Sequence, residues 1–373
     1  MKLTVDRTRD VLLAGAGSAL LAGLASCLGI VGFSTTFVVA WIASVSVSLF
    51  SSSLKISATG KSVLITGCDS GFGFQLALHL HRLGFDVFAG CLLANHGGEG
   101  AEQLRGVCSD RLHVIQLDVT NSKQLNEALR SVKDILALNG NVLWGIVNNA
   151  GVSAFGETEW LPLEVFRRIA DVNYFGLVSS TKTFLPLVRR AEGRVVNVSS
   201  MLGRMVYPMG SPYIATKYAV EGYSNCLRLE MRRWGVHVCT IEPGNLLRAT
   251  RISTKEHMKD QAEKMWSSMS EELREELGGR KVYDLQVCIA MGFSSSGMKD
   301  ATIVVEAMTD ALTQKYPRAR YLPMEFYNWA SQMIANYLPE CFFDNICSQV
   351  MRFLAWWHRS GRRDEMVGER GRH

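Results

Sequence analysis

The chain has 373 residues, of which 47% are hydrophobic and 20% charged, and its formal net charge is +5. This composition excludes a largely disordered protein, and the length accommodates one large domain or two smaller ones. The positive charge forms no basic stripe interleaved with aromatic residues, so a nucleic-acid partner is not expected. Residues 359–373 are rich in Arg and are interpreted as a basic, flexible tail.

The N-terminal segment is unusually apolar, because residues 11–54 contain no charged side chain. As one helix it would be about 66 Å long at roughly 1.5 Å per residue, whereas the hydrocarbon core of a bilayer is about 30 Å thick. We therefore expect a membrane anchor over residues 1–56 with two spans, at about 11–31 and 36–54, joined by a turn at "GFSTT". A cleaved signal peptide covering the first apolar run is the alternative, which the second run disfavours.

Basic residues flank this anchor on both sides. Lys2, Arg7 and Arg9 precede the first span, and Lys55 and Lys61 follow the second. The positive-inside rule places both flanks of a helical hairpin on the cytosolic face. We expect the catalytic domain to face the cytosol at the endoplasmic reticulum membrane, with a mitochondrial membrane as the alternative.

Cysteine usage also indicates a reducing compartment. The cysteines are odd in number and widely spaced, and no C-x-x-C motif occurs. We expect free, mostly buried thiols, which disfavours a lumenal or secreted catalytic domain. No Cys/His cluster has the spacing of a metal site, so no metal is expected. The nine positions are Cys27, Cys68, Cys91, Cys108, Cys226, Cys239, Cys288, Cys341 and Cys347.

From residue 60 onward, short β-rich runs alternate with longer helical runs. The β-rich runs are 62–66, 86–92, 112–119, 143–149, 193–200 and 236–244. Such alternation is typical of a parallel sheet covered by helices on both faces. It predicts a Rossmann-type, doubly wound α/β domain over 60–250, with its cofactor beyond the carboxyl ends of the strands.

Residues 251–358 are predicted to form substrate-binding or lid helices continuous with this domain. Residues 255–277 have the pattern of an amphipathic helix. Residues 335–358 are strongly apolar, and they form either a helix packed on the core, a lid over an apolar substrate, or a second membrane contact.

The first β-run leads into "TGCDSGFG" at 66–73, immediately before a helical run. Glycines at such a turn permit close approach of the backbone to a pyrophosphate, and the helix N-terminus offers free N–H groups. Asp69 either belongs to this cofactor site or caps the first helix. The candidate cofactor-binding residues here are Gly67, Asp69, Ser70, Gly71, Phe72 and Gly73.

The ends of later β-runs add further cofactor-binding candidates. Cys91 occupies the position where an acid would bind the ribose 2′-hydroxyl, and no Lys or Arg occurs from 85 to 104. A 2′-phosphate would lack a cationic partner, which favours NAD over NADP. Asp118 is placed to reach the adenine amino group. The remaining candidates are Asn149, Ala150 and Gly151 of "NNAG", and Pro243 and Gly244 of "EPGN".

A second constellation carries the chemistry. In "SPYIATKYAV", Tyr213 precedes Lys217 by four residues, so both side chains project from one face of a helix. Ser200 ends a β-run thirteen residues before Tyr213, and Asn173 lies in a helical run after "NNAG". A strand-end serine and a Tyr–Lys pair one turn apart can converge on one point beside a nicotinamide.

Together, "TGCDSGFG", "NNAG", Ser200, Tyr213-x-x-x-Lys217 and "EPGN" resemble the short-chain dehydrogenase/reductase family over about 60–250. Within it, the chain is most similar to a membrane-associated branch that includes D-β-hydroxybutyrate, type 2 hydroxysteroid and retinol dehydrogenases. The catalytic region is more similar to the hydroxybutyrate enzyme, whereas the double apolar span is more similar to the type 2 17β- and 11β-hydroxysteroid enzymes.

The resemblance implies a role for each catalytic candidate. Tyr213 would be the general acid/base, with its pKa lowered by Lys217 and by an oxidised nicotinamide. Lys217 would also hold the nicotinamide ribose, and Ser200 would hydrogen-bond the substrate oxygen. Asn173 would anchor a water that relays the proton, or it is only a helix-bend residue.

The expected function is NAD-dependent interconversion of a lipophilic secondary alcohol, steroid- or retinoid-like, and its carbonyl. One alternative is oxidation of (R)-3-hydroxybutyrate, for which Arg204, Arg248 and Arg251 are candidate carboxylate partners. A catalytically silent scaffold is a remote alternative, because all four catalytic candidates are present. By resemblance, we also expect a homo-oligomer.

Overall fold

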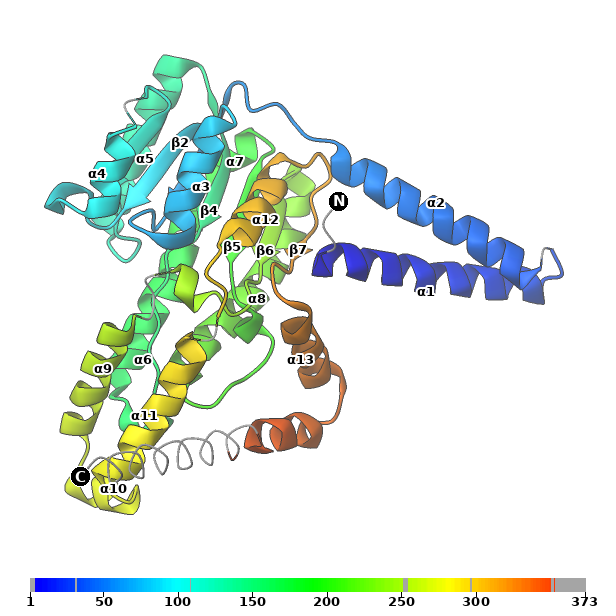
Figure 1. Ribbon diagram of the computed structural model, residues 1–373. Coiled ribbons are helices and arrows are strands. Elements are labelled where there is room, and N and C mark those ends of the chain that lie inside the picture. The colour runs from blue at the N-terminus through cyan, green and yellow to red at the C-terminus, as the bar shows by residue number, and fades with distance from the viewer. Residues whose placement is uncertain are drawn as a thin grey trace, which may run out of the picture.

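The computed structural model describes residues 4–30, 32–107, 109–250, 254–295, 297–349 and 352. Within them a seven-stranded sheet has the order β3-β2-β1-β4-β5-β6-β7, and all neighbouring strands are parallel (Figure 1). Its strands are β1 Lys61–Thr66, β2 Asp86–Cys91, β3 Leu112–Gln116, β4 Val142–Asn148, β5 Arg194–Val198, β6 His237–Ile241 and β7 Arg320–Tyr321. The predicted doubly wound α/β fold is confirmed.

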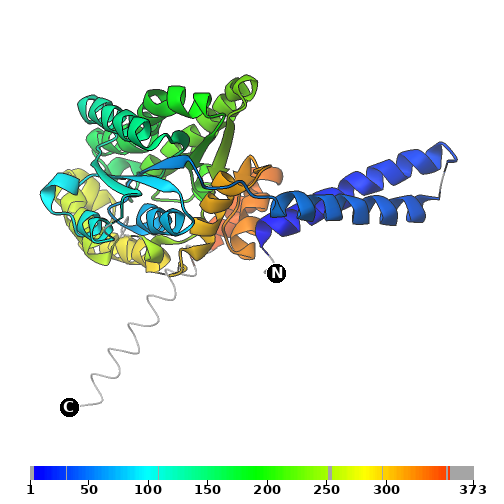
Figure 2. The same cartoon turned by 90° about the horizontal axis from the view of Figure 1, so that it is seen from above.

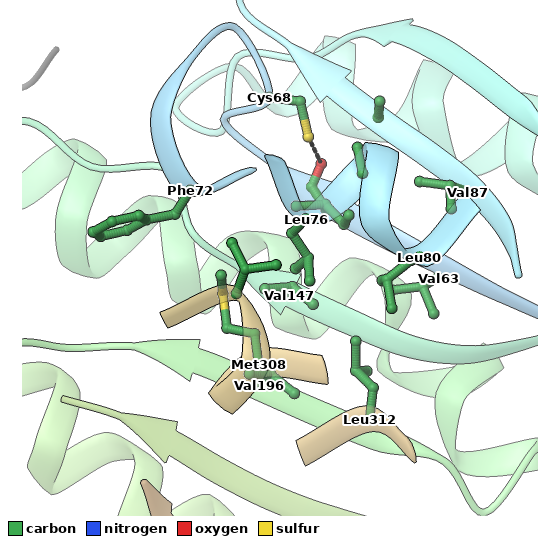
Figure 3. Packing of buried hydrophobic residues seen from close by; sticks show 14 of the residues in the cluster. Val63, Cys68, Phe72, Leu76, Leu80, Val87, Val147, Val196, Met308 and Leu312 are labelled. Carbon is green, nitrogen blue, oxygen red and sulfur yellow. Dashed lines mark hydrogen bonds between the residues drawn. The ribbon is translucent and has the colours of Figure 1, made fainter. Parts of the chain in front are cut away.

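Helices cover both faces of the sheet. One face carries α3 Gly71–Arg82, α4 Glu99–Arg105 and α12 Thr302–Thr313, and the other carries α5 Ser122–Asn139, α7 Leu177–Arg190 and α8 Ser211–Met231. Strand residues alternate between the two cores: Val63 and Ile65 belong to one, and Leu64 to the other. Figure 3 shows the first core, in which Leu76 and Leu80 of α3 meet Val63, Val147 and Met308.

The sequence did not reveal β7. A two-residue strand is too short to produce the alternation by which strands are recognised. In the sheet it pairs with β6 and forms the edge that lies nearest the N-terminal helices (Figure 1).

The C-terminal helices are more interrupted than predicted. Residues 255–277 form two helices, α9 Lys255–Ser268 and α10 Glu271–Glu276, because Ser270 caps the second one through Leu273 N. Next come α11 Arg280–Ser295 and, after β7, α13 Phe326–Tyr337. Pro339 separates α13 from helical residues 340–349, and the end of the predicted run at 353–358 lies outside the described residues.

The N-terminal segment forms two helices long and apolar enough to cross a membrane, α1 Val5–Cys27 and α2 Phe33–Ser53. They lie side by side as a hairpin that extends away from the domain (Figures 1 and 2). The predicted limits of 11–31 and 36–54 are shifted, because α1 already ends at Cys27, before Gly29 with its φ of +68°, and α2 begins at Phe33. Helix α1 also begins six residues earlier than predicted, and its first turns pack on the domain.

Candidate active site

The glycine-rich turn after β1 is locked against the "NNAG" segment after β4. Gly67 has a φ of +71°, and a Cβ there would lie 2.8 Å from the Cα of Ala150. Asn149 Nδ2 donates to Thr66 O at 2.9 Å and to Gly67 O at 3.0 Å. A Cβ at Gly73 would lie 2.4 Å from Gly67 O, so these glycines are needed for this packing.

The N-terminus of α3 has the features of a phosphate site. Ser70 occupies the N-cap position, but its side chain makes no capping hydrogen bond. The first-turn N–H groups therefore have no side-chain cap and, with the helix dipole, favour an anion. Gly71 has a φ of +62°, and the nearest atoms to a Cβ there, on Thr250, are 3.6 Å away. The segment from Gly67 to Gly73, including Phe72, thus fits a dinucleotide pyrophosphate.

Asp69 does not cap α3, which corrects one of the two interpretations of this residue. Its carboxylate accepts hydrogen bonds from Leu92 N at 2.8 Å and Leu93 N at 2.9 Å. Asp69 therefore fixes the loop after β2 next to the glycine-rich turn.

The predicted role of the Cys91 side chain is wrong. Cys91 is the last residue of β2, and its thiol is fully buried in the core, where burial and the charge of Asp69 raise its pKa to about 12. The first exposed side chains after β2 are instead Leu92 and Leu93. A shift of one residue along the strand is enough to exchange an exposed side chain for a buried one, because successive strand residues face opposite sides.

The structure also places a cation, Arg105, near the loop after β2. This residue lies one position beyond the interval 85–104, which contains no Lys or Arg. Arg105 Nη2 donates to Ala94 O at 2.9 Å, and its Nη1 pairs with Glu102 at 2.5 Å. Asp118 lies on the next strand end, where its Oδ1 accepts from Thr120 N at 2.9 Å and shapes the loop before α5.

Ser200, Tyr213 and Lys217 come together as predicted. The Ser200 hydroxyl lies near enough to the Tyr213 phenol to lower its pKa, and Ser200 Oγ accepts from Leu202 N at 3.1 Å. Lys217 Nζ lies 5.5 Å from the centroid of the Tyr213 ring and donates to Val198 O at 2.9 Å. The neighbouring Ser199 is buried against Gly203 instead.

The protein alone does not lower the pKa of Tyr213. Burial raises it to about 12, although the Ser200 hydroxyl opposes this shift. Burial also lowers the pKa of Lys217 to about 8, which the charge of Glu221 opposes. Lys217 alone therefore does not lower the pKa of Tyr213, and the predicted lowering by Lys217 together with an oxidised nicotinamide stays a prediction.

Asn173 lies in a π-helical segment, Asp171–Gly176, so it is a residue of an irregular helix. Its Oδ1 accepts from Val152 N at 2.8 Å, and its Nδ2 donates to Val152 O at 2.9 Å and to Thr216 Oγ1 at 3.1 Å. The side chain thus connects the loop after β4 to helix α8.

Pro243 and Gly244 support the Ser200 loop from β6. Met201 N donates to Pro243 O at 2.9 Å, and a Cβ at Gly244 would lie 2.7 Å from the Cβ of Met324. Sequence reasoning missed Glu221, Glu242 and Arg320 as parts of this site. Of these three residues, only Glu221 could have been found from the sequence, because it follows Lys217 by one helical turn.

Residues 61–260 match the family described as short chain dehydrogenase. The chain belongs to the short-chain dehydrogenase family, as the resemblance predicted, and it is a short-chain alcohol dehydrogenase/reductase that uses a nicotinamide cofactor.

Its relatives have different substrates in their names. D-beta-hydroxybutyrate dehydrogenase, mitochondrial, of Mus musculus is 46% identical over 290 residues, which are 78% of this chain and 84% of that protein. Retinol dehydrogenase 7 of Mus musculus is 42% identical, over 70% of this chain and 79% of that protein. Estradiol 17-beta-dehydrogenase 2 of Mus musculus is 39% identical, over 77% of this chain and 74% of that protein. A short-chain dehydrogenase from Streptomyces avermitilis, at 24% identity, matches 81% of this chain and 98% of its own with a TM-score of 0.57, which supports the fold.

Proposed function

We propose that this protein uses NAD to interconvert a lipophilic secondary alcohol, steroid- or retinoid-like, and its carbonyl at a membrane. The observation that carries this proposal is the convergence of Ser200, Tyr213 and Lys217 beside a largely apolar segment. Residues 201–210 contain three methionines and one charged residue, Arg204. In the same region Met209 packs against a cluster that includes Met265 of α9 and Tyr283 of α11.

In the proposed mechanism, Tyr213 Oη removes the hydroxyl proton of the alcohol, or returns it to the carbonyl. Ser200 donates a hydrogen bond to the substrate oxygen and stabilises its developing charge. A nicotinamide held at this site would supply the hydride chemistry at the carbinol carbon and, in its oxidised form, a positive charge. Lys217 would hold the nicotinamide ribose and supply a second positive charge near the phenol. The charges of Lys217 and the oxidised nicotinamide together would favour the phenolate form of Tyr213. Asn173 anchors a water that carries the proton towards solvent.

The loop after β2 supports NAD as the cofactor. Leu92 and Leu93 are uncharged, and the guanidinium of Arg105 is already engaged by Glu102 and Ala94 O. A 2′-phosphate would have to displace those contacts. The proposed cofactor contacts otherwise lie on Gly67–Gly73, Asn149–Gly151 and Pro243–Gly244, with Asp118 near the adenine.

Oxidation of (R)-3-hydroxybutyrate is the second candidate, because the 46% identical relative carries that substrate in its name. A small carboxylate would need a cation in the pocket. Arg204 is partly buried next to Tyr218, Arg248 is exposed, and Arg251 lies outside the described residues. Because Arg248 is exposed and Arg204 lies next to Tyr218, we rank the hydroxybutyrate reaction as the weaker proposal.

The reaction and its cofactor can be tested on purified full-length protein in detergent. We expect reduction of NAD with at least one alcohol from a panel of steroids, retinol and (R)-3-hydroxybutyrate, with a higher kcat/KM for NAD than for NADP. Absence of turnover across the panel would favour the silent scaffold. A preference for NADP would show that Arg105 leaves Glu102 to bind a 2′-phosphate.

We further propose that the α1–α2 hairpin anchors the enzyme in the endoplasmic reticulum membrane, with the catalytic domain in the cytosol and the protein present as a homo-oligomer. We expect it to stay in the pellet after carbonate extraction. Protease added to intact vesicles should reach both a tag at Met1 and the domain after Lys55. Protection of the tag alone would mean a single span, and cofractionation with mitochondria would support the alternative membrane.

A further inference from the structure

The first two turns of α1, residues 4–10, lie against the catalytic domain; we call this segment the head of α1. Val5 and Asp6 are buried there, whereas few later residues of the helix are buried. Val5 packs with Leu322 and Met324, which follow β7. The anchor is therefore joined to the domain by a packed interface as well as by the linker after α2.

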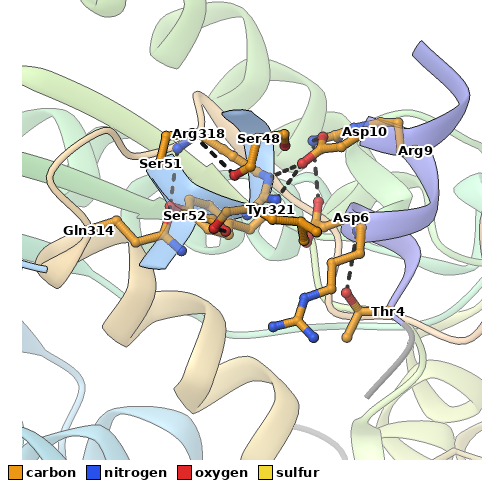
Figure 4. A network of polar contacts seen from close by, with 12 residues as sticks. Thr4, Asp6, Arg9, Asp10, Ser48, Ser51, Ser52, Gln314, Arg318 and Tyr321 are labelled. Atoms are coloured by element: carbon orange, nitrogen blue, oxygen red, sulfur yellow. Dashed lines mark hydrogen bonds and ion pairs between the residues drawn. The ribbon is translucent and has the colours of Figure 1, made fainter. Parts of the chain in front are cut away.

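Polar contacts strengthen this interface (Figure 4). Four hydrogen bonds join the head to the segment around β7. Leu322 N donates to Asp6 Oδ2 at 2.9 Å, and Arg9 Nη2 donates to Arg320 O at 3.3 Å. Arg318 Nε donates to Asp10 Oδ2 at 3.0 Å, and Arg318 Nη2 donates to the same oxygen. Strand β7 is the edge of the sheet, where main-chain groups would otherwise lack partners. The head covers this edge and fixes a strand of only two residues.

The side chain of Arg320 continues the contacts towards the active site. Its Nη1 pairs with Glu221 Oε2 at 2.6 Å and also with Glu242. Glu221 follows Lys217 by one turn on α8, and Glu242 is fully buried directly before Pro243. Arg320 therefore joins β7 to the catalytic helix and to the segment that supports the Ser200 loop.

A second connection passes through α13. Gln332 Nε2 donates to Glu242 Oε2 at 2.9 Å and to Met201 O at 3.4 Å. Met201 follows Ser200 directly, and it also lies against the apolar cluster that contains Val5. The head thus reaches the Ser200 loop through both polar and apolar contacts.

We propose that the head of α1 is a positioning element of the active site: by fixing β7 it holds Arg320 between Glu221 and Glu242, and so keeps Ser200 and Tyr213 in catalytic geometry. This inference rests on the roles of Ser200 and Tyr213 proposed above. The membrane anchor then supports turnover directly and is more than a tether. Its loss would leave Arg318 without Asp10 and would uncover Leu322 and Met324.

The test uses full-length protein in detergent and the variants Asp10→Asn, Asp10→Glu and the charge swap Asp10→Arg with Arg318→Asp. We expect Asp10→Asn to lower kcat roughly tenfold, since small misplacements of catalytic groups are costly. The KM for the cofactor and the Kd for NADH should change less than about twofold, because the pyrophosphate site is distant from β7 in the sheet order. Asp10→Glu and the swap should restore most of kcat.

Hydrogen–deuterium exchange provides a readout that needs no substrate. Asp10→Asn should speed exchange in 318–324 and also in 199–205, and neither segment should change in Lys55→Ala. That control removes another pair between anchor and domain, Lys55–Asp310 at 3.1 Å, which does not involve β7.

Two outcomes would overturn the proposal. If kcat were unchanged in Asp10→Asn and faster exchange were confined to 318–324, the head would stabilise only the segment around β7 and would not position the active site. A parallel loss of kcat, NADH affinity and Tm would make it a general stabiliser. If the wild type turns over no alcohol, the proposed function fails, whereas the exchange measurement still tests the connection from the head to the Ser200 loop.

Discussion

Replacing Tyr213 with Phe should reduce kcat by about 10²- to 10⁴-fold, the range typical of general acid/base catalysis. The change removes the phenol hydroxyl near Ser200 and keeps the aromatic ring beside Lys217. The Kd for NADH, measured by fluorescence titration, should stay within about threefold of the wild-type value. Alcohol oxidation by the wild type should rise with pH as Tyr213 ionises, and this dependence should vanish in the variant.

Tyr218→Phe is the matched control, because Tyr218 lies on the same helix and its side chain is 43% exposed. Its kcat should equal that of the wild type. If Tyr213→Phe retained half of the wild-type kcat, another group would have to be the acid/base and the proposed mechanism would be incorrect.

Replacing Gly73 with Ala should weaken NADH binding by about 10- to 100-fold, which corresponds to an overpacking cost of about 1–3 kcal/mol. The added Cβ would lie 2.4 Å from Gly67 O and 2.6 Å from Asn149 Nδ2. Relief requires the backbone of the glycine-rich turn to move, and this turn forms the proposed pyrophosphate site. Isothermal titration with NADH measures the loss.

Gly222→Ala provides the comparison for this variant. Gly222 lies on α8, and no atom lies within 4 Å of the place that a Cβ would take there. Ala should therefore preserve NADH affinity and raise helix stability by about 0.5–1 kcal/mol. Equal NADH affinity in Gly73→Ala and the wild type would mean that the turn does not form the phosphate site.

The sequence predicted those parts of the protein that depend on local patterns. Six strands produced recognisable β-runs, and the Tyr213–Lys217 spacing specified a shared helix face. These features need only a few consecutive residues, because the periods of strands and helices are fixed.

Features that depend on contacts between distant segments were not predictable. The burial of Cys91 depends on which side of β2 faces α3, and the position of Arg105 depends on the packing of α4. The contacts of Asp6 and Asp10 could not be predicted either, because their partners Leu322 and Arg318 lie more than 300 residues later. The pKa of Tyr213 is likewise set by burial, which the one-turn spacing to Lys217 does not reveal.

The central claim is that Tyr213, Ser200 and Lys217 act on a lipophilic alcohol beside an apolar segment. The most direct test compares kcat/KM for a secondary steroid alcohol, retinol and (R)-3-hydroxybutyrate with full-length enzyme in the same detergent and saturating NAD. We predict that a steroid or retinoid has the highest kcat/KM and that Tyr213→Phe abolishes its turnover. A higher kcat/KM for (R)-3-hydroxybutyrate than for either lipophilic alcohol would contradict this account.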